Sequence, residues 1–369
     1  MDPNYDSSRP IPFTQVVSRR WVVLAGVILS AFGGVFSSTP LQAEEGASVL
    51  ATGLVNPRGF DFTADGSLDV AIAGAANIDA GVARLFNGCA TPVVTGMPSY
   101  RIVFGAPTGV ADVAVLNDER YLLLAGGDTN RGNTPNGLYR YDDAGNIELV
   151  ANISAFIRDH PVAEKPRDFD TDGQPHALLP MEDGFWATEG NSNQLLRLGL
   201  DGSVTRVADL SAGHPIPTGI APAPDGGAYV GFFTGIPYIE GASRVMHISA
   251  DGSMRDVWTG LSLVTALAVD SDGSLYALEM ATDFDGNNPD SIRPGTGRVV
   301  RQSGPDSSEE VITGLTYPIA MAFGPDSALY VATPGFASDN GEGKILRFDL
   351  AADMPITTPV DLPLPAPCP

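Results

Sequence analysis

A β-hairpin pattern recurs along this chain of 369 residues. An alternating apolar stretch is followed by Asp-Gly or a close variant and then by a second apolar stretch, as in residues 60–70, 267–277 and 321–331. Such a pattern favours a tight hairpin turn, because the centre of the turn needs a positive φ that Gly and Asp tolerate. One hairpin would say little about the fold. The same hairpin at a long interval predicts an array of similar units.

Six such turns divide the chain into six units. Their spacing is close to the period of propeller blades, about 40–50 residues, with insertions in the longer units. Each unit also carries a second pair of short apolar stretches, and four short strands per unit are typical of a propeller blade. The sequence therefore predicts an all-β fold, a six-bladed β-propeller of four-stranded blades. The turns lie at Asp65-Gly66, Asn117-Asp118, Asp183-Gly184, Asp225-Gly226, Asp272-Gly273 and Asp326-Ser327.

The N-terminal part of this array predicts how the propeller closes. Residues 48–54 resemble residues 310–315, which form the outer strand of a unit, whereas no such strand follows residues 344–348 of the last unit. We expect the N-terminal strand to complete the last blade, because this pairing removes exposed strand edges. The propeller then spans residues 44–352, and residues 353–369 form a Pro-rich C-terminal tail.

Composition supports a folded chain and excludes some partners. The chain is 43% hydrophobic, with 42 Gly and 30 Pro, which fits many short strands joined by turns and argues against disorder. Its formal net charge of −23 disfavours nucleic acid and anionic membrane surfaces as partners.

The first residues have the features of an export signal. Arg19 and Arg20 precede an apolar stretch at residues 21–36, and small and polar residues lead to Ala43. This order predicts a signal peptide over residues 1–43 and a mature protein in the periplasm or outside the cell, without a stable membrane span. Ser18-Arg19-Arg20 also weakly resembles a twin-arginine signal, although an ordinary secretory signal is favoured. A retained N-terminal membrane anchor is the alternative.

The chain contains two cysteines, Cys89 and Cys368. Exported proteins keep disulfides. If the first and last blades are neighbours, these two residues could meet in one bridge, and two separate thiols remain the other interpretation. No Cys-x-x-Cys motif or Cys/His cluster suggests zinc or redox chemistry.

A short motif marks the start of the innermost strand of each unit, and propellers usually bind ligands at one end of the channel between these strands. In most units Pro precedes the central residue of this motif and a small Gly or Ala follows it, which lets the blades converge at the axis. We expect the six central side chains to form a ring that suits an anionic or polyhydroxylated ligand. They could equally be plain loop starts. The ring residues are Arg58, Thr108, His176, Thr218, Thr265 and Ile319.

Carboxylates follow inner strands in two units, at Glu189 and Glu279. Such groups act as general acids or bases, or they cap loops between blades. If the protein is an enzyme, His176 and Glu189 are the candidate catalytic residues.

Two acidic insertions have the alternating oxygens that calcium prefers, so Ca²⁺ is the one cofactor the sequence suggests. Neither insertion has the twelfth-position Glu of an EF-hand, and a solvated acidic loop is the alternative. The candidate ligands are Asp168, Asp170 and Asp172 in the first insertion and Asp283 and Asp285 in the second.

Two segments resemble the ScyD/ScyE family of exported β-propellers. They are Leu-Val-Asn-Pro-Arg-Gly-Phe at residues 54–60 and the region of residues 217–245, which contains the insertion Thr-Gly-Ile-Pro-Tyr at residues 234–238. The resemblance covers about residues 47–350. It implies a six-bladed fold outside the cytoplasm and carries over no catalytic residues. The blade repeats themselves are shared with NHL-type and many other propellers.

Two looser resemblances point to enzymes. Residues 184–194 resemble a blade of streptogramin lyases, in which His and Glu act near the channel, and here only His176 and Glu189 could take those parts. Gluconolactonase-like propellers hold a divalent metal at the axis through Glu, Asn and Asp, and that full set is not found in register.

The missing catalytic motifs, such as Gly-x-Ser-x-Gly and His-Glu-x-x-His, favour binding over catalysis. We therefore expect an exported ScyD/ScyE-like ligand-binding or accessory protein that takes an unidentified small molecule or protein at the channel mouth. The alternative is a lyase or lactonase acting on a lactone or cyclic ester, with or without a metal.

Overall fold

The computed structural model describes residues 46–365, apart from residues 103–104, 289–290, 351–353 and 360. The chain divides into two units, residues 1–41 and 42–369, and the described residues all belong to the second. The predicted signal peptide at residues 1–43 lies outside the described residues. In the described part of the chain, no helix is long and apolar enough to cross a membrane.

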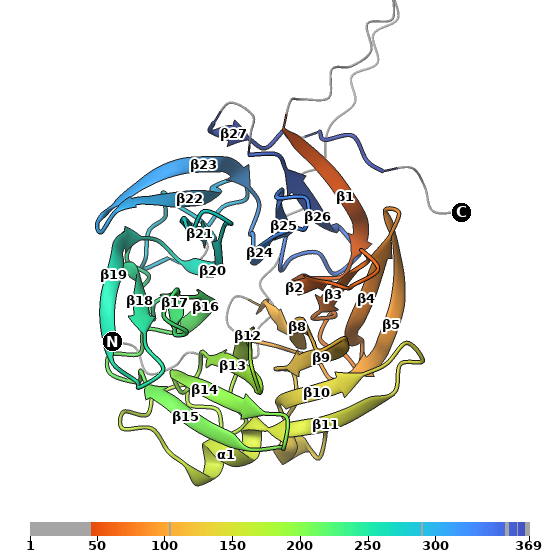
Figure 1. Ribbon diagram of the computed structural model, residues 1–369, viewed down its shortest axis with the longest axis vertical. Coiled ribbons are helices and arrows are strands. Elements are labelled where there is room, and N and C mark those ends of the chain that lie inside the picture. Colours follow the sequence, from red (N-terminus) through yellow and green to blue (C-terminus); the bar gives the residue numbers. More distant parts are fainter. Residues whose placement is uncertain (1–45, 103–104, 289–290, 351–353, 360, 366–369) are drawn as a thin grey trace, which may run out of the picture. The chain divides into compact units, whose positions relative to one another are not determined.

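Six antiparallel sheets surround a central axis (Figure 1), so the predicted six-bladed β-propeller is confirmed. Each blade is ordered from its inner to its outer strand. Blade 1 contains β2 (Pro57–Phe62), β3 (Leu68–Ile72), β4 (Ala80–Phe86) and β5 (Cys89–Met97). Blade 2 contains β8 (Val110–Leu116), β9 (Glu119–Leu124), β10 (Gly137–Tyr141) and β11 (Ile147–Asn152). Blade 3 contains β12 (Pro175–Met181), β13 (Gly184–Glu189), β14 (Gln194–Gly199) and β15 (Val204–Asp209).

The remaining blades follow the same order. Blade 4 contains β16 (Pro217–Pro222), β17 (Ala228–Phe232), β18 (Ser243–Ile248) and β19 (Met254–Leu261). Blade 5 contains β20 (Val264–Val269), β21 (Leu275–Glu279), β22 (Gly297–Gly304) and β23 (Ser307–Leu315). Blade 6 contains β24 (Ala320–Phe323), β25 (Leu329–Thr333), β26 (Gly343–Phe348) and β1 (Ala47–Leu54).

The turns between the two inner strands have the backbone that the sequence pattern predicts. Gly66, Gly226 and Gly273 have φ values of 82°, 81° and 83°. In blade 2, where Asp-Gly is replaced, Asn117 and Asp118 take φ values of 54° and 61°. These are residue types that tolerate the left-handed region, so the hairpin survives the substitution.

Blade 6 is closed by the N-terminal strand, as predicted. Strand β1 pairs antiparallel with β26, from Ala47 opposite Phe348 to Leu54 opposite Gly343. Asn56 adds a buried contact just after β1, because its Oδ1 accepts the backbone N–H of Ser338 at 3.0 Å. The ends of the ring are therefore joined by strand pairing and by side-chain hydrogen bonds.

In the described part of the chain, four short elements besides the C-terminal strand lie outside the blade pattern. Strands β6 (Tyr100–Arg101) and β7 (Pro107–Thr108) form a small hairpin between blades 1 and 2. The 3₁₀ helix η2 (Thr129–Arg131) lies within blade 2, and helix α1 (Ile153–Asp159) follows it. Asn152 caps α1 by accepting the N–H of Ala155 at 2.8 Å.

The C-terminal tail makes an additional pairing that the sequence did not predict. Strand β27 (Ile356–Thr357) pairs parallel with β23, so blade 5 has a fifth strand. Further along, Pro365 reaches the β4–β5 turn of blade 1, where a methyl group on Gly88 would lie 3.5 Å from the Cβ of Pro365. Cys89 begins β5, whereas Cys368 lies outside the described residues. The predicted bridge therefore stays a prediction.

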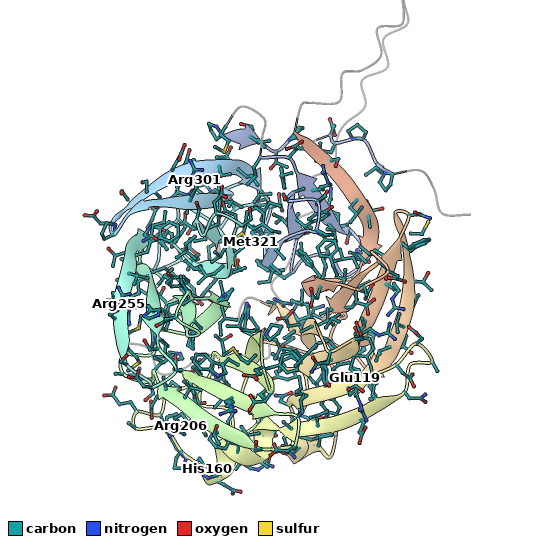
Figure 2. All side chains as sticks on the ribbon, in the orientation of Figure 1. Glu119, His160, Arg206, Arg255, Arg301 and Met321 are labelled. Carbon is teal, nitrogen blue, oxygen red and sulfur yellow. The ribbon has the colours of Figure 1, made fainter. Side chains whose placement is uncertain are left out.

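The hydrophobic core lies between neighbouring blades. Phe185 of blade 3 packs in one cluster with Leu123 of blade 2, and Trp258 of blade 4 packs in another with Val300 of blade 5. Burying each such side chain contributes roughly 1.5–3 kcal/mol. Charged side chains such as Arg255 and Arg301 lie on outer strands, while Met321 lies near the axis (Figure 2). Packing between blades thus holds the inner strands around the axis.

Candidate functional site at the propeller axis

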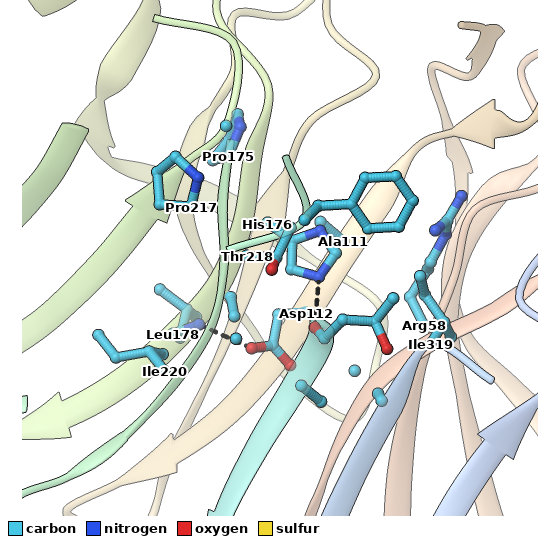
Figure 3. Close-up of a pocket in the computed structure, with 18 of the residues that line it drawn as sticks. Arg58, Ala111, Asp112, Pro175, His176, Leu178, Pro217, Thr218, Ile220 and Ile319 are labelled. Atoms are coloured by element: carbon cyan, nitrogen blue, oxygen red, sulfur yellow. Dashed lines mark hydrogen bonds between the residues drawn. The ribbon is translucent and has the colours of Figure 1, made fainter. Parts of the chain in front are cut away.

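A cavity of about 710 Å³ lies along the propeller axis. Residues of all six inner strands line it, together with the loops at the end where those strands begin. This volume is in the range of small-molecule sites. Figure 3 shows part of its wall, with side chains from blades 1, 2, 3, 4 and 6 labelled.

A break in strand register places one side chain of each inner strand at the axis. Between each inner strand and its neighbour, the pairing skips one or two residues close to the start of the strand in blades 1 to 5. Such a bulge leaves a residue unpaired and re-aims its side chain. In blade 6, the residue just before β24 takes this place. The six residues are Arg58, Ala111, His176, Thr218, Thr265 and Ile319, and all six line the cavity.

Blade 2 differs from the expected register. Thr108 belongs to β7 and pairs with Tyr100, so Ala111 occupies the bulge that the sequence motif assigned to Thr108. The β6–β7 hairpin places the Pro-Thr-Gly motif three residues too early, which a repeat count alone does not reveal. Thr108 still lines the cavity, and its Oγ1 donates to the carbonyl of Ala125 at 3.3 Å.

The ring threonines hold neighbouring blades together. Thr218 Oγ1 donates to the carbonyl of Val264 at 2.6 Å, and Thr265 Oγ1 donates to the carbonyl of Pro318 at 3.2 Å. Both side chains are buried. Because each hydroxyl has one proton, these groups have no second donor for a ligand.

Arg58 brings a positive charge to the cavity. Its Nη2 donates to the carbonyl of Pro107 in the linker to blade 2. Among the described residues, no carboxylate forms an ion pair with it. Burial lowers the pKa of Arg58 to about 10, so the guanidinium remains charged at neutral pH. A half-buried charge without a counter-ion is costly, and an anion in the cavity would lower that cost.

His176 reaches from blade 3 across the channel to blade 5. Its Nε2 lies 3.0 Å from the carbonyl oxygen of Thr265. A carbonyl oxygen only accepts, so Nε2 carries the proton and Nδ1 has a lone pair. Burial, with a smaller effect of the nearby Arg58 charge, lowers the pKa of His176 to about 4. The imidazole is therefore neutral at pH 7.

Asp112 is a cavity residue that the sequence reasoning missed. Its carboxylate accepts the backbone N–H groups of Leu178 at 2.7 Å and Val113 at 2.8 Å. Burial, partly offset by these bonds, raises its pKa to about 8. The corresponding position after the bulge is a small residue in other blades, such as Ala177 and Ala266. The assumed register of blade 2 hid this exception, because it aligned Gly109 with those small residues.

Glu189 does not reach the cavity with His176. Its buried carboxylate accepts the N–H groups of Gln174 at 2.7 Å, Asn191 at 3.0 Å and Ser192 at 2.8 Å. No described contact joins it to His176, and it is absent from the cavity wall. Glu279 likewise accepts the N–H of Ser262 and pairs with Arg298. Both carboxylates hold loops between blades.

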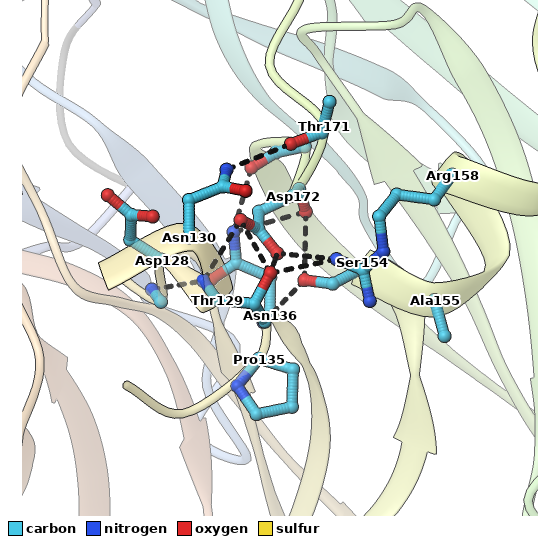
Figure 4. Close-up of polar contacts among 12 residues, drawn as sticks. Asp128, Thr129, Asn130, Pro135, Asn136, Ser154, Ala155, Arg158, Thr171 and Asp172 are labelled. Atoms are coloured by element: carbon cyan, nitrogen blue, oxygen red, sulfur yellow. Dashed lines mark hydrogen bonds and ion pairs between the residues drawn. The ribbon is translucent and has the colours of Figure 1, made fainter. Parts of the chain in front are cut away.

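The first acidic insertion is tied down by protein groups (Figure 4). Asp172 is buried and accepts from the N–H and the hydroxyl of Thr129 at 3.0 and 2.8 Å, and it pairs with Arg158 Nη1 at 3.0 Å. Asp170 accepts the hydroxyl of Tyr100 at 3.3 Å. Asp168 lies 3.5 Å from His214 Nε2. The three carboxylates thus face different partners.

The second acidic insertion shows the same pattern. Asp285 accepts the N–H of Asn287 at 3.0 Å, and the N–H of Asp283 donates to Glu240 at 2.9 Å. Over the described ranges, no group of three or more His, Cys, Asp or Glu residues is arranged to hold a metal ion. Carboxylates of both insertions therefore face protein groups, and the calcium sites stay a prediction.

Comparison with known proteins supports the fold. No protein-family model matches the chain, and no curated protein sequence is similar to it. A gluconolactonase from Xanthomonas campestris has a similar structure, with a TM-score of 0.55 and 15% identity over 83% of this chain and 91% of that one. A putative oxidoreductase (glucose dehydrogenase) from Thermus thermophilus has a TM-score of 0.54 and 15% identity over 82% and 99%.

A calcium-binding regucalcin from Agrobacterium tumefaciens is similar at the same level. Its TM-score is 0.53, with 15% identity over 82% of this chain and 92% of that one. At such identities the likeness shows the propeller fold alone.

Proposed function

We propose that this protein binds a small organic anion in its axial cavity and does so outside the cytoplasm, as a propeller of the ScyD/ScyE type. The observation that carries the proposal is Arg58, a charged side chain that lines the cavity without a carboxylate partner among the described residues. A guanidinium binds a carboxylate through two parallel hydrogen bonds. Such charge-assisted bonds contribute about 1.5–3 kcal/mol each.

His176 supports the same proposal as a neutral neighbour of Arg58. With Nε2 donating to the carbonyl of Thr265, its Nδ1 is available to accept a hydrogen bond from an O–H or N–H of the ligand. The depressed pKa of His176 keeps a second positive charge out of the site at neutral pH. Arg58 and His176 together offer one cation and one hydrogen-bond acceptor, whereas Arg101, the other arginine of the cavity wall, is paired with Asp339 at 2.6 Å.

The proposal is tested by calorimetric titration of the mature chain with acetate, gluconate and aromatic carboxylates. Arg58→Met keeps the length of the side chain and removes its charge, so we expect binding to weaken by at least about tenfold. Arg255→Met on the outer strand β19 is the matched control and should bind as the natural chain does. Equal affinity of the Arg58→Met variant and the natural chain would show that the proposal is wrong.

A lyase or lactonase is the second candidate. The lone pair on Nδ1 of His176 favours this candidate, because it would let His176 act as a general base. Two features favour ligand binding over catalysis. The pKa of about 4 makes His176 a weak base, and Glu189 is engaged in its loop. A screen of lactones and cyclic esters with and without Ca²⁺ separates the two candidates. Turnover that His176→Gln abolishes would favour the enzyme.

A further inference from the structure

The mouth of the axial cavity has an apolar side, formed by blades 4, 5 and 6. Phe233 and Tyr238 follow β17, Met280 follows β21 and Phe336 follows β25, and all four line the cavity. The Phe233 and Tyr238 rings meet edge to face with centroids 5.5 Å apart, and Phe336 stacks on Tyr317 at 4.4 Å. These contacts fix the rings as a wall.

Interlocked loops hold this apolar side in place. The N–H of Tyr238 in blade 4 donates to the carbonyl of Gly286 in blade 5 at 3.0 Å. A methyl group on Gly286 would lie 1.5 Å from the carbonyl oxygen of Tyr238, so only glycine fits there. Beyond the wall, Ile236 and Ile239 are 64% and 59% exposed. Apolar surface therefore continues from the cavity to the rim.

The rest of the mouth, around blades 2 and 3, is polar. Four polar side chains line it. Asn191 belongs to blade 3, and the other three come from the connections before blade 2, before blade 3 and after blade 3, namely Tyr100, Gln174 and His214. Gln174 Nε2 donates to the hydroxyl of Tyr100 at 3.5 Å. Asn193 Nδ2 donates to Nδ1 of His214 at 2.7 Å, so His214 Nε2 carries the proton. Tyr100 and Asn191 donate within the protein, to Asp170 and to the carbonyl of Asp168. The second proton of the Gln174 amide is a donor that this side offers to a ligand.

Charge at the mouth limits the ligand further. Asp168 lines the cavity, and Asp170 contacts Tyr100 beside it. These carboxylates and the net charge of −23 repel a second negative charge on a ligand. Arg58 in the same cavity can neutralise only one, because Arg101 is already paired with Asp339.

We propose that the ligand is a monocarboxylate with a flat apolar body and a hydroxyl on its far edge. Its carboxylate binds Arg58, its apolar face lies against the wall of Phe233 and Phe336, and its hydroxyl meets the side of Tyr100 and Gln174. This inference rests on the proposed function, because it takes Arg58 as the anion contact. A cavity of about 710 Å³ has room for two or three fused or linked rings.

The test uses 6-hydroxy-2-naphthoate as the probe, titrated calorimetrically into the mature chain. Its comparison compounds are the neutral 6-hydroxy-2-naphthamide and the hydrophilic gluconate. We expect the naphthoate to bind at least about tenfold more tightly than either compound. Arg58→Met should remove the advantage over the amide.

Variants of the apolar wall test the orientation of the ligand. Phe336→Leu should weaken binding of the naphthoate about three- to tenfold, because a leucine side chain loses ring contact. Binding of gluconate should not change. Phe86→Leu is the matched control, since Phe86 is 58% exposed on β4 of blade 1. Equal thermal midpoints of the three chains show that folding is intact, and Phe233→Leu replaces Phe336→Leu if that variant is unstable.

The outcomes separate the inference from the proposed function. If gluconate binds more tightly than the naphthoate and needs Arg58, the ligand class is wrong and the anion site stands. If the naphthoate and its amide bind equally while another anion needs Arg58, the inference fails alone, and if no anion needs Arg58, both fail. If the naphthoate is preferred but Phe336→Leu and Phe233→Leu leave its affinity unchanged, the apolar body does not lie against this wall, and the inference fails alone.

Discussion

At the scale of the residue, one position of the inner strand differs from blade to blade while the backbone around it repeats. The bulge residue is Arg58 in blade 1 and His176 in blade 3, whereas in blades 4 and 5 it is a threonine whose hydroxyl bonds the next blade. The threonines serve the fold. The two charged or titratable side chains are the ones left to interact with a ligand.

His176 predicts a dependence of stability on pH. Burial lowers its folded pKa to about 4, below the unfolded value near 6.5, so between these values the unfolded chain binds more protons than the folded one. Its contribution is therefore present above pH 6.5 and is lost as pH falls toward 4. His176→Gln retains a donor for Thr265 and does not titrate, so we expect it to lose less stability on acidification, by roughly 1–3 kcal/mol.

Denaturant unfolding of both chains at pH 7 and pH 5 measures this difference. His160→Gln is the matched control, because His160 is exposed and follows helix α1 on the outer side of the propeller. If the natural chain and His176→Gln lose equal stability between the two pH values, the prediction that His176 stays neutral in the folded chain at pH 5 is wrong.

At the scale of the element, the inner strand combines a bulge with a small residue after it. Blade 2 breaks this pattern with Asp112, and blade 1 compensates with Gly59. A methyl group on Gly59 would lie 1.8 Å from Asp112 Oδ1, so the carboxylate occupies the space that a side chain on β2 would need. At the interface between blades 1 and 2, the Asp112 carboxylate thus fits only because residue 59 is a glycine.

This pairing predicts strongly coupled substitutions. Gly59→Ala alone should destabilise the chain by about 1–3 kcal/mol or more, because the methyl group forces Asp112 out of its place. In an Asp112→Ala background the same change should cost much less, since the carboxylate is gone. Denaturant unfolding of the four chains of this cycle gives the coupling energy. Additive effects of the two substitutions would show that the seam does not depend on their contact.

At the scale of the whole molecule, the ring is closed twice. Strand β1 completes blade 6 by pairing with β26, and the C-terminal tail runs from β23 of blade 5 to the β4–β5 turn of blade 1. Because the tail contacts blades on both sides of blade 6, it spans the place where the chain ends meet. The predicted bridge between Cys89 and Cys368 would fasten the tail there.

A disulfide at this place predicts lower stability when it is removed. We expect Cys368→Ser to lower the free energy of unfolding by about 2–4 kcal/mol, because the bridge restricts the unfolded chain. Cys89→Ser should have the same effect, and the double variant should lose no more than either single one. Mass spectrometry of a non-reduced digest should show the two peptides linked. Two separate peptides, each with a free thiol, would contradict the prediction.

The sequence by itself determined the architecture. Turns such as Asp65-Gly66 and Asp272-Gly273, between alternating apolar stretches, are local signals whose physics acts over a few residues, so counting them predicted six blades. The closing strand at residues 48–54 was likewise visible, since a blade without its outer strand needs one from elsewhere. Arg58 and His176 were found because the register of blades 1 and 3 follows directly from the motif.

The tertiary structure decided which side chains share the site. The β6–β7 hairpin shifts the register of blade 2, so Ala111 and Asp112 occupy the places assigned to Thr108 and Gly109. Glu189 has the position of a catalytic carboxylate, yet its hydrogen bonds hold a loop. Likewise, the mouth divides into an apolar and a polar side only once loops from different blades meet. Contacts between residues far apart in the chain depend on packing, so local sequence patterns do not predict them.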